Sequence, residues 1–328
     1  MNIQIRSEKL SDYSAIANVN YEAFLGWHPD NWRVSEPVMV DLLRHSENFS
    51  PDLSLIAEIA GEVSGHVLFS IYQFIVAGTV QQGAVLAPIA VKPEFQKRGI
   101  GTMLIEEGHR RAKAKGCTFS LLCGHDTYYP KFGYKTKMFS ESGTKITVNL
   151  PQFDLQAFST RPVSSKDLPD IIKAWKSRHG ADALALFPGE AINAWYNYGF
   201  ACRCDMVLKN NRVLGYIRYV RTNPLQVKEL LAKTEDIPDI LAWLACVQYS
   251  RPQGEIHIAL PAEGLQFLQN HQGFGLVDTR AAYTAFMIKV LEQNSPIAQY
   301  CDQVEKGSLK PGIVVFPSLF DLDDGRTE

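Results

Sequence analysis

The sequence predicts an α/β (α+β) protein built from two tandem domains, each with a mixed, mostly antiparallel, splayed sheet flanked by helices. Three observations predict this class. The length of 328 residues suits two domains of about 100–200 residues. Strand-like and helix-like patterns alternate along the chain, and landmarks of the first half recur in the same order in the second. With 46% apolar and 21% charged residues, the chain can bury a sizeable core.

The first elements follow from local patterns. A short alternating run at residues 4–6 predicts a strand, and Ser11 or Asp12 can cap the helix that comes next. Residues 53–74 form two alternating runs joined by a turn at Gly61, which is the pattern of a β-hairpin.

A second group of elements surrounds a glycine-rich loop. Residues 84–91 predict a strand that leads through the loop into a helix over 99–115. Residues 118–124 predict another strand, and 125–134 a short helical or turn segment. A final strand is expected at 145–150, closing the first domain.

The second half begins as the first does. Arg6 precedes Asp12 by six residues, and Arg161 precedes Asp167 by six, each pair at a strand-to-helix connection. The hairpin and a late glycine also recur, with Gly65 and Gly133 in the first half answered by Gly215 and Gly273 in the second. These ordered repeats predict a tandem duplication.

The copies differ where the glycine-rich loop should recur. The hairpin glycine and the late glycine are 68 residues apart in the first copy but 58 apart in the second, which has no QxxGxG sequence. We therefore expect an intact domain at 1–150 and a degenerate copy at 157–292. Residues 293–328, with three prolines and an acidic end, are expected to form an exposed tail.

Bulk properties exclude several classes of protein. A net charge of −2 lacks the positive field of a nucleic-acid binder. The polar amino terminus does not resemble a secretory signal, and no stretch approaches the ~20 apolar residues that span a bilayer. Six scattered cysteines contain no CxxC pair, so we expect no metal site and a reducing, cytoplasmic compartment.

The loop Gln96-Lys97-Arg98-Gly99-Ile100-Gly101 carries the strongest chemical signal. Free N–H groups and the dipole at a helix amino terminus favour an anion, and glycine allows a phosphate to approach the backbone. Lys97 and Arg98 add positive charge. The spacing fits neither the dinucleotide-binding GxGxxG fingerprint nor a Walker loop, so the loop predicts a different phosphate site.

Two neighbouring features extend this site. Pro88 cannot donate a ladder hydrogen bond, so the strand that contains it is expected to lie at an edge, to bulge, or to splay from its neighbour. A splayed sheet would free the backbone of 89–91 to pair with an extended ligand that carries amides. Downstream, the phenol of Tyr129 could donate a proton or a hydrogen bond to a departing thiolate.

The segments LAPIAVKPEFQKRGIGTMLIEEG and LLCGHDTYYPKFGYK resemble the GCN5-related N-acetyltransferase (GNAT) superfamily over roughly residues 3–150. The resemblance implies two acyl-CoA N-acyltransferase-like domains, acetyl-CoA as donor, and direct attack of an amine on the thioester. It implies Tyr129 as the general acid towards the sulfur. It also implies a cofactor site made by Ile89, Ala90, Val91, Gln96, Lys97, Arg98, Gly99, Ile100, Gly101 and Thr102.

The sequence departs from the family at the general base. Many members carry a glutamate on or near the fourth strand, but residues 83–91 contain no carboxylate. Candidates are His125, whose residue type has a pKa near 6.5, Glu22 on the first helix, and Asp126. Each of them could equally be a solvated surface group.

Three functions stay open at this stage. The first is N-acetylation of a primary amine in a small molecule or peptide, the second is a non-catalytic acyl-CoA sensor or assembly module, and the third is a pure scaffold. The intact loop together with Tyr129 favours the enzyme. The degenerate second domain could also serve as an interface in a homo-oligomer.

Overall fold

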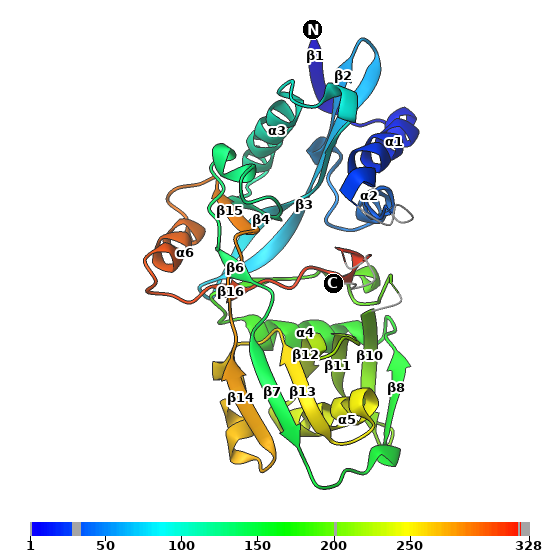
Figure 1. Ribbon diagram of the computed structural model, residues 1–328, viewed down its shortest axis with the longest axis vertical. Helices are drawn as coiled ribbons and strands as arrows, with labels where there is room; N and C mark the ends of the chain where they lie inside the picture. The colour runs from blue at the N-terminus through cyan, green and yellow to red at the C-terminus, as the bar shows by residue number, and fades with distance from the viewer. Residues whose placement is uncertain (1, 28–33, 200–201, 321, 323–328) are drawn as a thin grey trace. The chain divides into compact units, whose positions relative to one another are not determined.

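The computed structural model describes residues 2–27, 34–199, 202–320 and 322, and the chain divides into two compact units. The first unit comprises Met1–Val76, Val80–Met138 and Thr284–Ser308, and the second comprises Ala77–Thr79, Phe139–Tyr283 and Leu309–Glu328. Both combine a mixed sheet with helices, which confirms the predicted fold class (Figure 1). No helix within the described ranges is long and apolar enough to cross a bilayer.

The sheet of the first unit follows the order β1-β2-β3-β4-β5-β15. Its strands are β1 (Ile3–Ser7), β2 (Ser54–Ile59), β3 (Glu62–Val76), β4 (Thr79–Val91), β5 (Phe119–Cys123) and β15 (Phe286–Val290). Its helices are α1 (Tyr13–Phe24), α2 (Glu36–Arg44), α3 (Ile100–Ala114) and α6 (Pro296–Glu305). The sheet is antiparallel from β1 to β3, and β4 pairs with β5 in parallel.

Successive side chains of β3 point to opposite faces of this sheet, because a strand has a period of two. On one face, fully buried Phe69 lies against α3, so close that a Cβ on Gly108 would fall 2.0 Å from its ring. On the other face, buried His66 contacts the amide of Asn20 on α1 at 3.1 Å. Figure 1 shows α3 on one side of the strands and α1 on the other.

The sheet of the second unit has the order β14-β7-β13-β12-β11-β10-β8. Its strands are β7 (Thr144–Asn149), β8 (Phe158–Pro162), β10 (Cys202–Lys209), β11 (Arg212–Val220), β12 (Leu225–Ala232), β13 (Gln253–Ile258) and β14 (Phe274–Asp278). Its helices are α4 (Leu168–His179) and α5 (Ile237–Tyr249). The short strands β6 (Phe139–Ser140) and β16 (Gly312–Ile313) pair in parallel, and β9 (Leu184–Leu186) passes close to β16.

The two units repeat one local structure. Arg6 donates to both carboxylate oxygens of Asp12 at 2.7 and 3.0 Å, and Arg161 does the same to Asp167 at 2.8 and 2.6 Å. Each aspartate also accepts a backbone N–H from three residues before it. The strand directions match too, since β12 and β13 form the parallel pair that corresponds to β4 and β5. The predicted tandem arrangement is confirmed.

The sequence boundaries do not coincide with the spatial units. The strand expected to close the first domain, β7, lies between β13 and β14 in the second sheet. Conversely, β15 pairs with β5 in the first sheet, although it lies in the range assigned to the second domain. Neither unit is therefore a single segment ending near residue 150. Strands that pair in a sheet can lie far apart in the sequence. An alternating pattern predicts that a segment is a strand but does not predict which strand it pairs with.

The segment 293–328 is not the exposed tail that its prolines and acidic end suggest. It contains α6, in which Ile297 and Tyr300 are buried, and the Tyr300 hydroxyl donates to the carbonyl of Met138 at 2.6 Å. Apolar residues three and four positions apart give this helix a buried stripe. Residues 321 and 323–328 lie outside the described part of the chain.

The sequence analysis predicted no helix over the residues that form α2 (Glu36–Arg44).

A buried histidine gives the second unit a specific pH dependence. His179 lies 2.7 Å from an oxygen of Asp182 and 3.1 Å from one of Glu229. Burial alone would lower the pKa of His179, but the two carboxylates outweigh it and raise the pKa to about 9. Between pH 6.5 and 9 the folded unit therefore holds a proton that the unfolded chain releases.

We expect the second unit to lose stability as the pH rises from 6.5 to 9, by at most about 3 kcal/mol. The change can be measured as a fall in the urea midpoint, followed by tryptophan fluorescence, to which Trp175 contributes with its ring centroid 4.8 Å from that of His179. Asp182→Asn removes one of the carboxylates that raise the folded pKa of His179, so its loss of stability above pH 6.5 should be smaller and should end at lower pH. An unchanged wild-type midpoint across this range would refute the assignment of the proton to His179.

Candidate active site

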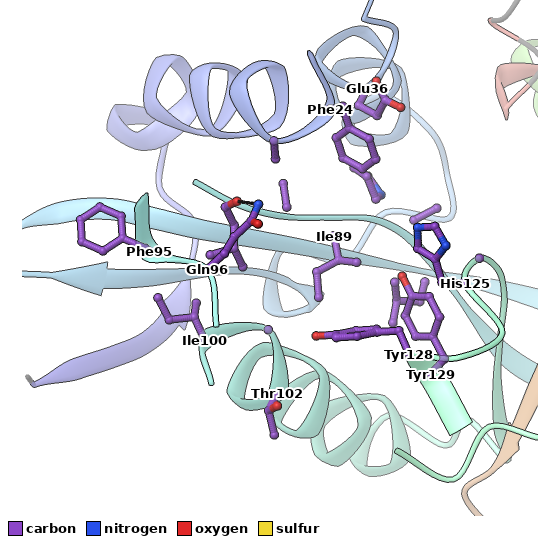
Figure 2. Close-up of a pocket in the computed structure, with 18 of the residues that line it drawn as sticks. Phe24, Glu36, Ile89, Phe95, Gln96, Ile100, Thr102, His125, Tyr128 and Tyr129 are labelled. Atoms are coloured by element: carbon purple, nitrogen blue, oxygen red, sulfur yellow. Dashed lines mark hydrogen bonds between the residues drawn. The ribbon is translucent and has the colours of Figure 1, made fainter. Parts of the chain in front are cut away.

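A cavity of about 690 Å³ opens in the first unit where β4 and β5 diverge. The parallel register of the two strands runs only from Gly83/Phe119 to Val85/Leu121. Beyond it lies Pro88, which has no N–H to donate. The predicted splay is therefore present, and the cavity occupies it (Figure 2).

The glycine-rich loop closes one end of the cavity. The side-chain amide of Gln96 donates to the carbonyl of Val91 at 3.0 Å, which ties the loop to the end of β4. Gly99 then takes a left-handed conformation with φ of +82° and precedes the first residue of α3. A side chain at Gly99 would strain the backbone, so this glycine sets the direction from which α3 begins.

The amino terminus of α3 faces the cavity. The N–H of Met103 donates to the carbonyl of Gly99 at 3.1 Å, so the amides of Gly101 and Thr102 precede this bond. Such amides lack carbonyl partners within the helix and, with the helix dipole, favour a bound anion. Lys97 adds positive charge to the cavity lining. This end of the cavity has the chemistry of a phosphate cradle.

Gly101 is required for close packing within this cradle. A Cβ at Gly101 would lie 2.6 Å from the hydroxyl oxygen of Tyr128, a distance at which atoms clash, and 4.0 Å from the side chain of Ile89. Figure 2 shows the ring of Tyr128 directed towards the start of α3. The cradle is therefore narrow at this point, and only glycine fits without displacing a neighbour.

Tyr129 lies at the opposite end of the splayed strands, at the start of a short 3-10 turn (Tyr129–Phe132). The N–H groups of Tyr128 and Tyr129 both donate to the carbonyl of His125, at 3.1 and 3.3 Å. Gly124 lies so close that a Cβ there would be 2.5 Å from the Tyr129 ring. The side chain is only 9% exposed, and burial raises the pKa of Tyr129 well above its usual value. The phenol therefore stays protonated at neutral pH.

Helices α1 and α2 supply the remaining wall of the cavity. Ala23 and Phe24 end α1, and Glu36 and Met39 come from the first turns of α2. Figure 2 shows Phe24 and Glu36 on this wall, with His125 and Tyr129 across the cavity from them.

The cavity brings together most of the predicted site residues. Of the ten cofactor residues expected from the sequence, all except Arg98 are among the described residues that line it. Arg98 is exposed, with its guanidinium 5.5 Å from the ring centroid of Phe95. Tyr129 and exposed His125 line the cavity as well, whereas Glu22 and Asp126 are exposed and do not.

Sequence reasoning missed several lining residues, among them Glu36, Met39, Cys123, Tyr128 and Lys131. Tyr128 and Lys131 belong to the segment already singled out around Tyr129, so adjacency could have flagged them. Nothing in the local sequence pattern marks Glu36, because its helix reaches the cavity only through tertiary packing.

The second unit has a different connection at the corresponding place. Eight residues, 92–99, join β4 to α3, but only four, 233–236, join β12 to α5. The shorter connection contains no glycine and forms a single 3-10 turn, Thr234–Asp236. The described residues 233–236 therefore form no anion cradle like that of the first unit.

The part of the chain that lines the cavity is similar to known proteins. The model of the Acetyltransferase (GNAT) family matches residues 19–134. The uncharacterized N-acetyltransferase YjhQ of Escherichia coli (strain K12) is 36% identical over 125 residues. The match covers 38% of this chain and 65% of that protein.

Solved structures match the chain over most of its length. A GCN5-related N-acetyltransferase from Anabaena variabilis has a TM-score of 0.64 at 14% identity, covering 89% of this chain and 73% of its own. One from Kribbella flavida has a TM-score of 0.59 at 18% identity, covering 89% and 72%. At such identities the likeness concerns the fold alone, and it extends over both units.

Proposed function

Because residues 19–134 belong to the GNAT family of acetyltransferases, we propose that this protein is an acetyl-CoA-dependent N-acetyltransferase. Its acceptor is a primary amine of a small molecule or peptide. The observation that carries the proposal is the presence, in one cavity, of an anion cradle at α3 and a buried, protonated phenol at Tyr129.

The described residues fit the donor part by part. The amides at the start of α3 and the charge of Lys97 suit a diphosphate. The backbone of Ile89 to Val91, which lies past the end of the β4–β5 register, suits the amides of a pantetheine arm. The narrow approach at Gly101 suits a phosphate held against backbone.

The chemistry requires little more than positioning and one proton donor. The donor, when bound, supplies a thioester carbonyl that an amine can attack directly. Tyr129 donates a hydrogen bond to the departing sulfur, which stabilises the charge that develops there. Exposed His125 lines the same end of the cavity.

The direct test is release of free CoA thiol from acetyl-CoA across a panel of arylalkylamines, polyamines, aminoglycosides and peptides. Wild-type protein is expected to release thiol with at least one amine and to form the matching amide, detected by mass spectrometry. Binding of acetyl-CoA without turnover of any amine would instead support the sensor, and absence of binding would refute both functions.

A further inference from the structure

The acceptor end of the cavity has a charge pattern of its own. Among the described lining residues, Glu36 is the one carboxylate, whereas the lysines are Lys97 and Lys131. Lys97 belongs to the cradle loop. The Nζ of Lys131 lies 3.8 Å from the ring centroid of Tyr128, whose hydroxyl reaches Gly101. Lys97 thus lies in the cradle and Lys131 beside the phenols, whereas the negative charge of Glu36 lies on the opposite wall, formed by α1 and α2 (Figure 2).

The geometry points to Glu36 as the residue that binds the acceptor ammonium and takes its proton, with Phe24 and Met39 forming the surface for an apolar acceptor body. This inference rests on the proposed acetyltransferase function. It names the substrate class as a monoamine on an aryl or alkyl body. It also replaces exposed Glu22 with Glu36 as the candidate base.

A buried network fixes the helix that carries Glu36. At the other end of α2, Arg44 donates to both oxygens of Glu8 at 3.0 and 2.9 Å, with the two side chains only 5% and 3% exposed. The hydroxyl of Ser54 on β2 also donates to Glu8, at 2.7 Å. A buried, bidentate pair of this kind holds its elements in one geometry. The position of Glu36 is therefore set by the sheet.

The apolar residues on the same wall as Glu36 limit which further polar groups an acceptor can have. Phe24, Met39 and Ala23 offer no hydrogen-bonding side chain, so a second charge or several hydroxyl groups placed there would lose hydration without compensation. An amino acid would bring its α-carboxylate towards Glu36, where like charges repel. Polyamines, aminoglycosides and free amino acids are thus disfavoured relative to an arylalkylamine.

The proton balance of the step is complete with these residues. The acceptor ammonium gives one proton to the Glu36 carboxylate, and the freed nitrogen lone pair attacks the thioester carbon. The C–N bond forms and the C–S bond breaks. The sulfur leaves as a thiolate that accepts a hydrogen bond from Tyr129 and then takes one proton from solvent. A second nitrogen proton, lost as the tetrahedral intermediate collapses, goes to solvent, as does the proton on Glu36. The products are the amide, CoA thiol and one proton.

The test compares 2-phenylethylamine, phenylalanine and spermidine as acceptors for wild type, Glu36→Gln and Asp41→Asn. Asp41 lies on the same helix, outside the cavity lining, and its 67% exposed carboxylate pairs with Arg44 at 2.7 Å. The buried bonds from Arg44 to Glu8 remain when that pair is lost, so Asp41→Asn is a matched neutralisation. Wild type should use 2-phenylethylamine at least about 10-fold better, by kcat/KM, than either other amine. Glu36→Gln should lower kcat/KM for it by about 10²-fold or more, leave the Kd for acetyl-CoA unchanged, and be partly rescued by Glu36→Asp.

The outcomes separate this inference from the function on which it rests. If wild type acetylates amines but Glu36→Gln remains as active as Asp41→Asn, Glu36 does not have the role inferred here and the acetyltransferase function stands. If spermidine or phenylalanine is the better acceptor, the substrate class is wrong. If Glu36→Gln loses acetyl-CoA binding as well, Glu36 acts on the fold or the donor site instead. If wild type acetylates none of the panel, the proposed function fails first.

Discussion

Replacing Gly101 with tryptophan is expected to abolish acetyl-CoA binding while the fold is retained. The first added atom, Cβ, already falls 2.6 Å from the Tyr128 hydroxyl, and an indole would extend from there into the cradle. It would occupy the place where a diphosphate must meet the amides of α3. Isothermal titration calorimetry should show an affinity loss of at least about 100-fold, or no detectable heat.

A graded series makes this prediction specific to the cradle. Gly101→Ala adds only the Cβ, and the atom it meets is the far end of the Tyr128 side chain, so binding should weaken by roughly 10-fold or less. Tyr128→Phe removes that hydroxyl and leaves the Cζ atom, 3.9 Å from the added Cβ, as the nearest atom of that ring. The double variant Gly101→Ala/Tyr128→Phe should therefore bind better than Gly101→Ala with Tyr128 intact.

Two results would count against the cradle. Retention of wild-type affinity by Gly101→Trp would mean that the donor binds elsewhere. Loss of binding by Gly101→Trp together with a large fall in its thermal midpoint would indicate a folding defect. Gly101→Ala and Gly101→Ala/Tyr128→Phe then test the cradle, because each changes only a few atoms.

The cradle could be predicted from sequence because it is contiguous. Pro88, the loop and the start of α3 lie within fifteen residues, and each acts through local backbone chemistry: a missing N–H, a left-handed turn, exposed amides. Tyr129 was also within reach, since it follows β5, the strand that pairs with β4.

The acceptor wall could not be predicted in the same way. Helix α2 has nine residues and only two fully buried apolar side chains, Val40 and Leu43, so its periodic signal is short. Its placement depends on the ion pair between Arg44 and Glu8, 36 residues apart in sequence. The sheet membership of β7 and β15 is harder still, since an alternating pattern gives the face of each side chain but not the partner strand.

Tyr129→Phe is expected to lower kcat by about 10²-fold with little change in acetyl-CoA affinity. The substitution removes one oxygen and keeps the ring, which packs at right angles to Tyr128 and close against Gly124. Burial raises the pKa of this phenol, whereas a free thiol has a pKa of about 8.5. Full proton transfer to the thiolate is therefore uphill, and a strong hydrogen bond to the developing charge is the main contribution.

That distinction gives a measurable consequence. A hydrogen-bond donor with a raised pKa stays protonated through pH 10, so wild-type kcat should show no basic limb from Tyr129 below that pH. The effect of Tyr129→Phe should also shrink with acyl donors whose leaving thiol is more acidic, because a more stable thiolate needs less help. Tyr128→Phe is the matched control. If it lowers kcat as much as Tyr129→Phe does, the assignment of the hydrogen-bond donor to Tyr129 is wrong. If neither substitution changes kcat, thiolate departure does not limit the reaction, and the buried position of Tyr129 serves packing alone.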